Sequence, residues 1–154
     1  MMPPDLEPPA PSPILALDLG ERRIGVAVSD PARRLALPLT TIAHVNRDVD
    51  LAAIAAMAAE QGAGLIVLGL PRRTDDTEGP EAAKVRRFGQ RLQRFLGLPV
   101  AYVDEWETTV EVHQRLIAAD VSRGKRMRLV DQLAAALILE RYLQGRGVEP
   151  ADGG

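Results

Sequence analysis

Residues 14–30 constrain the fold of this chain more than any other stretch. They read ILALDLGERRIGVAVSD, two short apolar runs separated by a turn at Gly20. Short apolar runs that flank a glycine turn predict a β-hairpin rather than a helix. Asp18 then lies inside the first strand or at its end, among apolar neighbours. A carboxylate in such surroundings costs free energy unless something pairs with it or binds it, so Asp18 is the first candidate for a functional residue.

Length and composition predict one globular domain. The chain has 154 residues, enough to bury a core, and we expect a disordered proline-rich tail over residues 1–13, a folded domain over 14–144 and a flexible tail over 145–154. The sequence contains no cysteine, which excludes disulfides and thiolate metal sites, and no apolar run approaches the roughly 20 residues that cross a bilayer. We therefore expect a cytoplasmic protein without membrane contact. The net charge of −2 does not by itself indicate a nucleic-acid partner.

Strand and helix patterns alternate after the hairpin. We expect strands at residues 35–42, 65–70 and 100–103. We expect a first helix that is capped by Asn46 or Asp48, runs to about Gln61 and is ended by Gly62 and Gly64, and a second at about 80–96 that is ended by Gly97. Further helices are expected at about 108–119 and 129–143, with a basic connector at 120–128. Hairpins followed by right-handed β-α-β crossovers predict an α/β fold, a mixed five-stranded sheet with helices on both faces.

Acidic residues fall where such a sheet usually carries its site. Sites in open α/β sheets lie at the C-terminal ends of strands, and Asp18 and the pair Asp104–Glu105 occupy such ends. Asp131 shares a face of the last helix with Ala135 and Ile138, which predicts that it points inward. Three carboxylates brought together would repel one another, and a hard divalent cation such as Mg²⁺ or Mn²⁺ removes that conflict. Two such ions can activate water for phosphodiester hydrolysis.

Each acid also has a plainer interpretation. Asp18 is compatible with a turn or cap residue, Asp131 with the N-cap of the last helix, and Glu105 with a solvated loop. Asp104 and Glu105 point to opposite faces of a strand, and the sequence does not choose between them.

Four segments in register resemble the YqgF family, also called RuvX, whose members are known as Holliday junction resolvases. The segments are DLGERRIGVAVSD, VLGLPRRTDDTEG, VDEWETT and KRMRLVDQLAAALILERYL, and the resemblance covers about residues 14–143. It implies an RNase H-like fold similar to RuvC and a metal-dependent nuclease. By this resemblance the catalytic and metal-binding residues are Asp18, Glu105 and Asp131, with two Mg²⁺ or Mn²⁺ ions. The implied substrates are four-way DNA junctions, or the small-subunit ribosomal RNA precursor, which is trimmed at its 5′ end.

Basic residues near the predicted strand ends are candidates for holding the nucleic-acid backbone, which positions a strand without reading its sequence. They are Arg22, Arg23, Arg72, Arg73, Lys125, Arg126 and Arg128. Junction resolution needs paired cuts, so we expect a homodimer. The chain departs from the family at Trp106 and Glu107, where the usual pattern has Arg-Leu, and this removes a candidate phosphate contact.

Two other functions are compatible with parts of the pattern. A nucleic-acid-binding module without catalysis is favoured by the acidic pI of about 5.7, and disfavoured by the presence of all three acids. A sugar-kinase or actin-like ATPase also has an Asp-x-Gly hairpin, but such proteins enclose ATP between two domains, for which this chain is too short.

Overall fold

A computed structural model of the chain describes residues 12–71, 77–105, 114–115, 117–119 and 122–152. Its centre is a six-stranded sheet in the order β3-β2-β1-β4-β5-β6. The strands are β1 Ile14–Leu19, β2 Arg23–Ser29, β3 Ala36–Ala43, β4 Leu65–Leu70, β5 Val100–Asp104 and β6 Val148–Asp152. β1, β4 and β5 run parallel, whereas β2, β3 and β6 pair antiparallel to their neighbours. The mixed α/β sheet expected from the sequence is confirmed.

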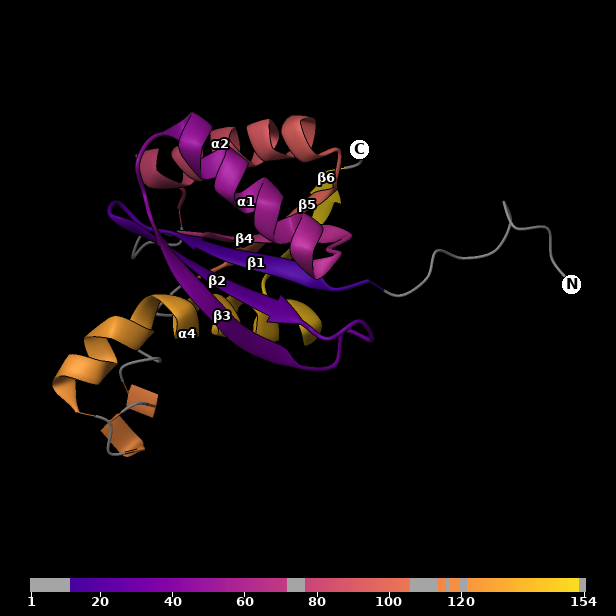
Figure 1. The fold of residues 1–154 in the computed structure, drawn as a ribbon. Helices are drawn as coiled ribbons and strands as arrows, with labels where there is room; N and C mark the ends of the chain where they lie inside the picture. Colours follow the sequence, from indigo (N-terminus) through magenta and orange to yellow (C-terminus); the bar gives the residue numbers. More distant parts are fainter. Residues whose placement is uncertain (1–11, 72–76, 106–113, 116, 120–121, 153–154) are drawn as a thin grey trace, which may run out of the picture.

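Helices cover both faces of this sheet (Figure 1). The helices α1 Arg47–Gln61 and α2 Pro80–Leu96 pack on one face, and α4 Arg123–Leu143 packs on the other. Because both faces are covered, the inner strands read as continuous apolar runs. Alternation along β1 sends Leu15 and Leu17 toward α1 and α2, and Ile14 and Ala16 toward α4. Asp18 continues the second series, so its side chain faces α4.

The ends of α1 and α2 are set by residues that the sequence predicts for them. The Asn46 side chain accepts a hydrogen bond from the Val49 N–H at 2.9 Å and so caps α1. Gly62 and Gly97 follow the two helices with φ of 67° and 68°, the left-handed conformation that glycine adopts at low cost. Both helices therefore begin and end close to the predicted positions.

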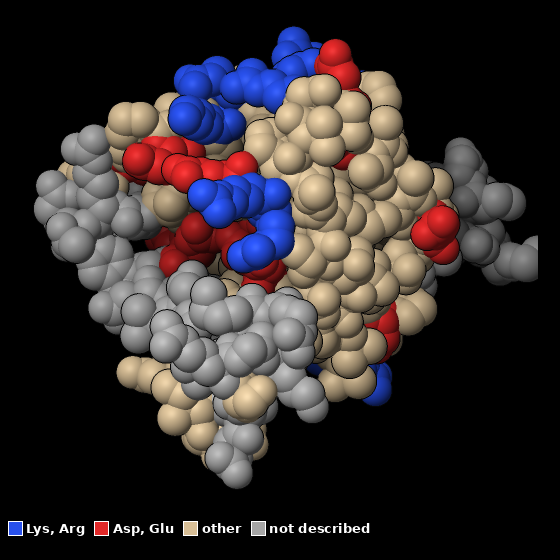
Figure 2. All heavy atoms as spheres, turned by 60° about the vertical axis from the view of Figure 1, so that its left-hand side comes forward, with Lys and Arg blue, Asp and Glu red and all other residues tan. Residues whose placement is uncertain are grey.

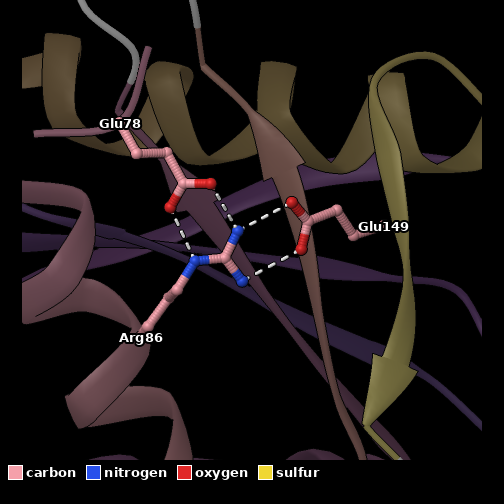
Figure 3. Close-up of polar contacts among 3 residues, drawn as sticks. All are labelled: Glu78, Arg86 and Glu149. Atoms are coloured by element: carbon pink, nitrogen blue, oxygen red, sulfur yellow. Dashed lines mark hydrogen bonds and ion pairs between the residues drawn. The ribbon is translucent and has the colours of Figure 1, made fainter.

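The C-terminal part of the chain differs from the prediction. Instead of five strands and a flexible tail over 145–154, residues Val148–Asp152 form the sixth strand, β6, paired antiparallel with β5. This segment has one apolar residue with a strong strand preference, so local pattern does not reveal it. Its pairing is reinforced from a distant element. Arg86 of α2 binds Glu149 of β6 on one side and Glu78 on the other (Figure 3).

The last helix begins earlier than predicted. α4 starts at Arg123, not near residue 129, so residues 123–128 are helical rather than a connector. Arg, Lys and Met, which fill most of these positions, are good helix formers, and this explains the longer helix despite Gly124. Most of the helix expected at 108–119 lies outside the described residues, although residues 114, 115, 117 and 118 are helical. In the described part of the chain, no helix combines the length and the apolarity needed to cross a membrane.

Candidate active site

The C-terminal ends of β1, β4 and β5 lie at the same edge of the sheet, because these strands are parallel neighbours. Figure 2 brings forward the left-hand side of Figure 1, where β1 turns into β2, and shows acidic and basic side chains crowded together there. Asp18 is the last residue but one of β1, and Glu105 directly follows β5. The two acids that come closest in space are therefore delivered by strands separated by β4 alone.

The carboxyl groups of Asp18 and Glu105 are hydrogen-bonded to each other and half-buried. Burial raises the pKa of Asp18 to about 6; the hydrogen bond from Glu105 opposes this rise and the negative charge of Asp131 adds to it. Burial, followed by the charge of Asp18 and the hydrogen bond to it, raises the pKa of Glu105 to about 9. Glu105 therefore keeps a proton at neutral pH and donates it to Asp18. Without a cation, the pair avoids a double negative charge by retaining this proton.

Glycine in β4 makes room for the Glu105 carboxyl group. A Cβ atom added to Gly69 would lie 2.3 Å from Glu105 Oε2 and 2.4 Å from Ile138 Cδ1. The Glu105 N–H also donates to the Leu70 carbonyl at 3.1 Å, which fixes the backbone just beyond the strand. Asp104 points elsewhere, since its side chain lies beside Gly147 in the turn before β6. The structure thus brings Glu105 rather than Asp104 to Asp18.

Asp131 reaches the same edge from α4. A Cβ added to Gly25 would lie 1.9 Å from the Asp131 carbonyl oxygen, so only glycine lets α4 approach β2 this closely. Gly25 is the pairing partner of Asp18 in β2. Asp131 Oδ2 accepts a hydrogen bond from Arg23 Nε at 2.7 Å. Because α4 begins at Arg123, Asp131 lies well inside the helix, and its interpretation as an N-cap is wrong.

The chemistry of these donors fits a hard divalent cation. All three side chains offer carboxylate oxygens, the ligands that Mg²⁺ and Mn²⁺ prefer, and the Asp18–Glu105 pair holds a proton that a cation would replace. Among the described residues no three acidic, His or Cys side chains already form a cage for a metal ion. Asp131 is engaged with Arg23 instead. To bind the cation, Asp131 would therefore have to break its ion pair with Arg23.

Some site residues were not found by sequence reasoning. Gly25 and Gly69 create the space at the site, and glycine inside a strand is itself a signal of close approach. Arg141 of α4 lies near enough to Glu105 for its charge to oppose the rise in the pKa of that residue, and its Nη1 donates to the Asp104 carbonyl at 3.2 Å. Arg141 lies within the last family segment, but a single basic residue near the end of a largely apolar helix did not by itself indicate a role at the site.

The structure places the predicted basic residues unevenly. Arg22 is exposed at the β1–β2 turn, and Arg23, with 55% of its side chain exposed, is paired with Asp131. Lys125, Arg126 and Arg128 lie on the first turns of α4. Arg72, Arg73, Trp106 and Glu107 lie outside the described residues. Of the seven basic candidates, the described part of the chain therefore brings Arg22 and Arg23 to the acidic edge.

Comparison with known proteins identifies the family. The family model for RuvX, described as Holliday junction resolvase, matches residues 12–145. The chain belongs to the RuvX family. This confirms the resemblance seen in the four sequence segments and places the chain among nucleases, enzymes that hydrolyse phosphodiester bonds.

Similar proteins with assigned names agree with this membership. A relative from Cereibacter sphaeroides is 45% identical over 130 residues, covering 84% of this chain and 81% of the relative. One from Moorella thermoacetica is 44% identical over 134 residues, covering 87% of this chain and 96% of the relative. Both are named pre-16S rRNA nuclease.

Solved structures of RuvC share the fold of this RuvX chain. RuvC of Thermus thermophilus in complex with a Holliday junction has a TM-score of 0.57 and 11% identity, covering 90% of this chain and 99% of RuvC. At this identity the likeness shows the fold alone, and it confirms the RNase H-like architecture expected from the sequence.

Proposed function

We propose that this RuvX protein is a divalent-cation-dependent endonuclease whose site is formed by Asp18, Glu105 and Asp131. The observation that carries the proposal is the half-buried, proton-sharing pair of Asp18 and Glu105 at the strand ends. Structural carboxylates usually gain a basic partner when they are buried. Here two acids face each other instead, an arrangement that is costly unless a ligand uses it.

The residues of the chain divide the work at this edge. Asp18 and Glu105 provide the carboxylate oxygens, and Arg141 limits the negative charge on the side of Glu105. Arg23 holds Asp131 when no substrate is bound, and its exposed guanidinium can pair with a phosphate once Asp131 turns to the cation. When bound, Mg²⁺ or Mn²⁺ would supply charge stabilisation and an activated water for the hydrolysis.

Two substrates have separate support. The names of the relatives from Cereibacter sphaeroides and Moorella thermoacetica favour the 5′ end of precursor 16S rRNA. The description of the family favours branched DNA, the Holliday junction. Because the relatives share about 45% of their residues with the chain, whereas RuvC shares 11%, precursor rRNA is the first candidate and the four-way junction the second.

A side-by-side cleavage assay tests the proposed activity. Purified protein is incubated with precursor 16S rRNA and with a four-way DNA junction, in Mg²⁺, in Mn²⁺ and in EDTA. We expect cleavage of at least one substrate with a cation and none with EDTA. Asp18→Asn should reduce the rate by about a thousandfold or more, because it removes a carboxylate that binds the cation.

The matched control is Asp48→Asn, the same chemical change at a carboxylate that is 88% exposed on α1. It should cleave like the wild type. Undiminished cleavage by Asp18→Asn would remove Asp18 from the reaction. Binding of both nucleic acids without cleavage in any cation would favour the non-catalytic binding module instead.

A further inference from the structure

A cavity lies at the sheet edge that carries the acids, but on the opposite face of the sheet. It has a volume of about 380 Å³, within the range of roughly 300 to 1,000 Å³ typical of small-molecule sites. Its inner wall is apolar and is built from the ends of the β1–β2 hairpin and from α2. The wall residues are Leu19, Ile24, Val85 and Phe88. Leu19 directly follows Asp18 in β1, so consecutive residues belong to the acidic site and to this cavity.

The cavity carries a histidine held by a buried acid. Asp50 of α1 is 2% exposed and contacts His44 Nδ1 through Oδ2, while its Oδ1 accepts a hydrogen bond from the Val45 N–H at 3.1 Å. The His44 backbone N–H donates to the Arg22 carbonyl at 2.9 Å, which ties this residue to the hairpin turn. The ring is thus fixed at Nδ1, and 39% of the side chain remains exposed at the cavity.

Charges of both signs surround the opening. Arg47 and Lys84 line it, as do Glu21 and Glu81, and within the described residues none of these four side chains is in an ion pair. Two positive and two negative groups do not favour a bare phosphate, which a cluster of one sign would attract. They do provide hydrogen-bond donors and acceptors together, above an apolar wall that contains one aromatic ring.

We propose that this cavity binds one unpaired nucleobase of the strand whose backbone is cut at the acidic site. A nucleobase is planar and apolar on its faces and carries both donors and acceptors on its edge, which matches the wall and the rim. His44 Nδ1 contacts Asp50, so His44 Nε2 is the atom with a fixed position that can hydrogen-bond to the edge of the base. The exposed Arg22 and the exposed guanidinium of Arg23 lie at the turn between the two sites, where a strand would pass from one face to the other.

This inference rests on the proposed nuclease function for its substrate class, but its binding test needs no cleavage. The full chain, labelled with ¹⁵N and free of metal, is titrated with adenosine, uridine, their 5′-monophosphates and inorganic phosphate, while amide shifts are followed by NMR. We expect a nucleoside to shift the amides of Leu19, Ile24 and Lys84 with millimolar affinity, and phosphate alone to shift none of them. Shifts with phosphate but not with nucleosides, or with neither, would overturn the proposal.

A conservative variant isolates the base contact. In His44→Asn the amide nitrogen occupies the place of Nδ1 and still donates to Asp50, while the Nε2 end is lost. Nucleoside affinity should fall about fivefold, since one hydrogen bond is removed. Arg94→Ala, an exposed charge in the last turn of α2 outside the cavity, should leave it unchanged. An unchanged affinity in His44→Asn would contradict the assignment of His44.

Cleavage kinetics separate the failure of this site from the failure of the nuclease. His44→Asn should raise KM and leave kcat close to the wild-type value, because the residue binds substrate away from the reacting bond. Wild-type cleavage without any nucleoside binding would refute the cavity and leave the nuclease intact. Nucleoside binding by a protein that cleaves nothing would support the cavity and refute the nuclease function.

Discussion

In the proposed site, a proton and a divalent cation would compete for the carboxylate oxygens of Asp18 and Glu105. In the cation-free protein the raised pKa values of both groups mean that folding favours their protonated forms. The negative charge of Asp131 acts less strongly on the other two carboxyl groups because Arg23 forms an ion pair with it. The site is thus arranged so that a divalent ion, once present, takes the place of one proton and one ion pair.

Stability of the cation-free protein should fall as pH rises. A group whose folded pKa is raised contributes stability below its unfolded pKa, near 4 here, and loses it as pH passes the folded values of about 6 and about 9. We expect the free energy of unfolding, measured with urea in EDTA, to decrease steadily between pH 5 and 9, because both carboxyl groups bind their protons more tightly in the folded protein than in the unfolded chain.

Glu105→Gln provides the control, because the Gln side chain can still donate a hydrogen bond to Asp18 but does not titrate. Its stability should change less above pH 7 than that of the wild type. Adding Mg²⁺ should stabilise the wild type more at high pH, where fewer protons compete. A wild-type stability that rises steadily from pH 5 to 9 in EDTA would contradict the raised pKa values.

Gly69 should be needed for the geometry of Glu105. In Gly69→Ala the new methyl group would displace the Glu105 carboxyl group and the Ile138 side chain, both of which can move at modest cost. We expect cleavage to fall by about tenfold or more while the fold survives, since small misplacements of catalytic groups are expensive. Gly25→Ala should instead destabilise the fold strongly, because its neighbour is the α4 backbone. Full activity in Gly69→Ala would show that Glu105 does not need this position.

At the scale of elements, the Arg86 side chain of α2 binds both β6 and the segment that leads into α2. Arg86 binds Glu149 and Glu78 at 2.7 Å each (Figure 3). It also lies over the Tyr102 ring, 5.2 Å from its centre. Both carboxylates raise the pKa of Arg86 further above its ordinary value, so it stays charged. β6 therefore depends on a partner 63 residues earlier in the chain.

Removal of this arginine should loosen β6 in particular. Arg86→Ala leaves Glu78 and Glu149 without their shared partner, and should cost about 2 kcal/mol in the free energy of unfolding, as expected for hydrogen bonds to charged groups. Hydrogen exchange of the β6 amides should speed up more than that of the β1 amides. Arg87→Ala, an exposed neighbour, is the control and should change neither. Equal stability of both variants would contradict a fastening role.

Features of the structure were predictable where their signal lies within one segment, and were missed where they depend on residues far apart in the chain. β1, β4 and α1 were predictable because their apolar runs and caps, such as Asn46, lie within the elements themselves. Asp18 stood out because it interrupts an apolar strand. β6 was missed because only Val148 in it has a strong strand preference and its ion pair with Arg86 joins residues 63 positions apart. The pairing of Asp131 with Arg23 likewise joins residues 108 positions apart. Gly25 and Gly69 carried a usable signal, glycine within a strand, that was not used.

At the scale of the whole molecule, one sheet edge carries two sites on opposite faces. The acids lie on the α4 side and the nucleobase cavity on the side of α1 and α2, with the β1–β2 turn between them. With one proposed cutting centre in each chain, paired cuts in a junction would need two copies. We propose a homodimer for that substrate. Light scattering should then give a dimer mass on junction DNA, whereas a monomer that cuts precursor rRNA would favour the ribosomal substrate.

Asp18, Glu105 and Asp131 are proposed to share a divalent cation. Anomalous diffraction from crystals soaked in MnCl₂ measures this directly. We predict an anomalous peak within bonding distance of the Asp18 and Glu105 carboxylates, with Asp131 turned away from Arg23 toward it, and no peak there in Asp18→Asn. Manganese bound elsewhere, with the Asp18–Glu105 hydrogen bond and the Arg23–Asp131 pair intact, would contradict the account.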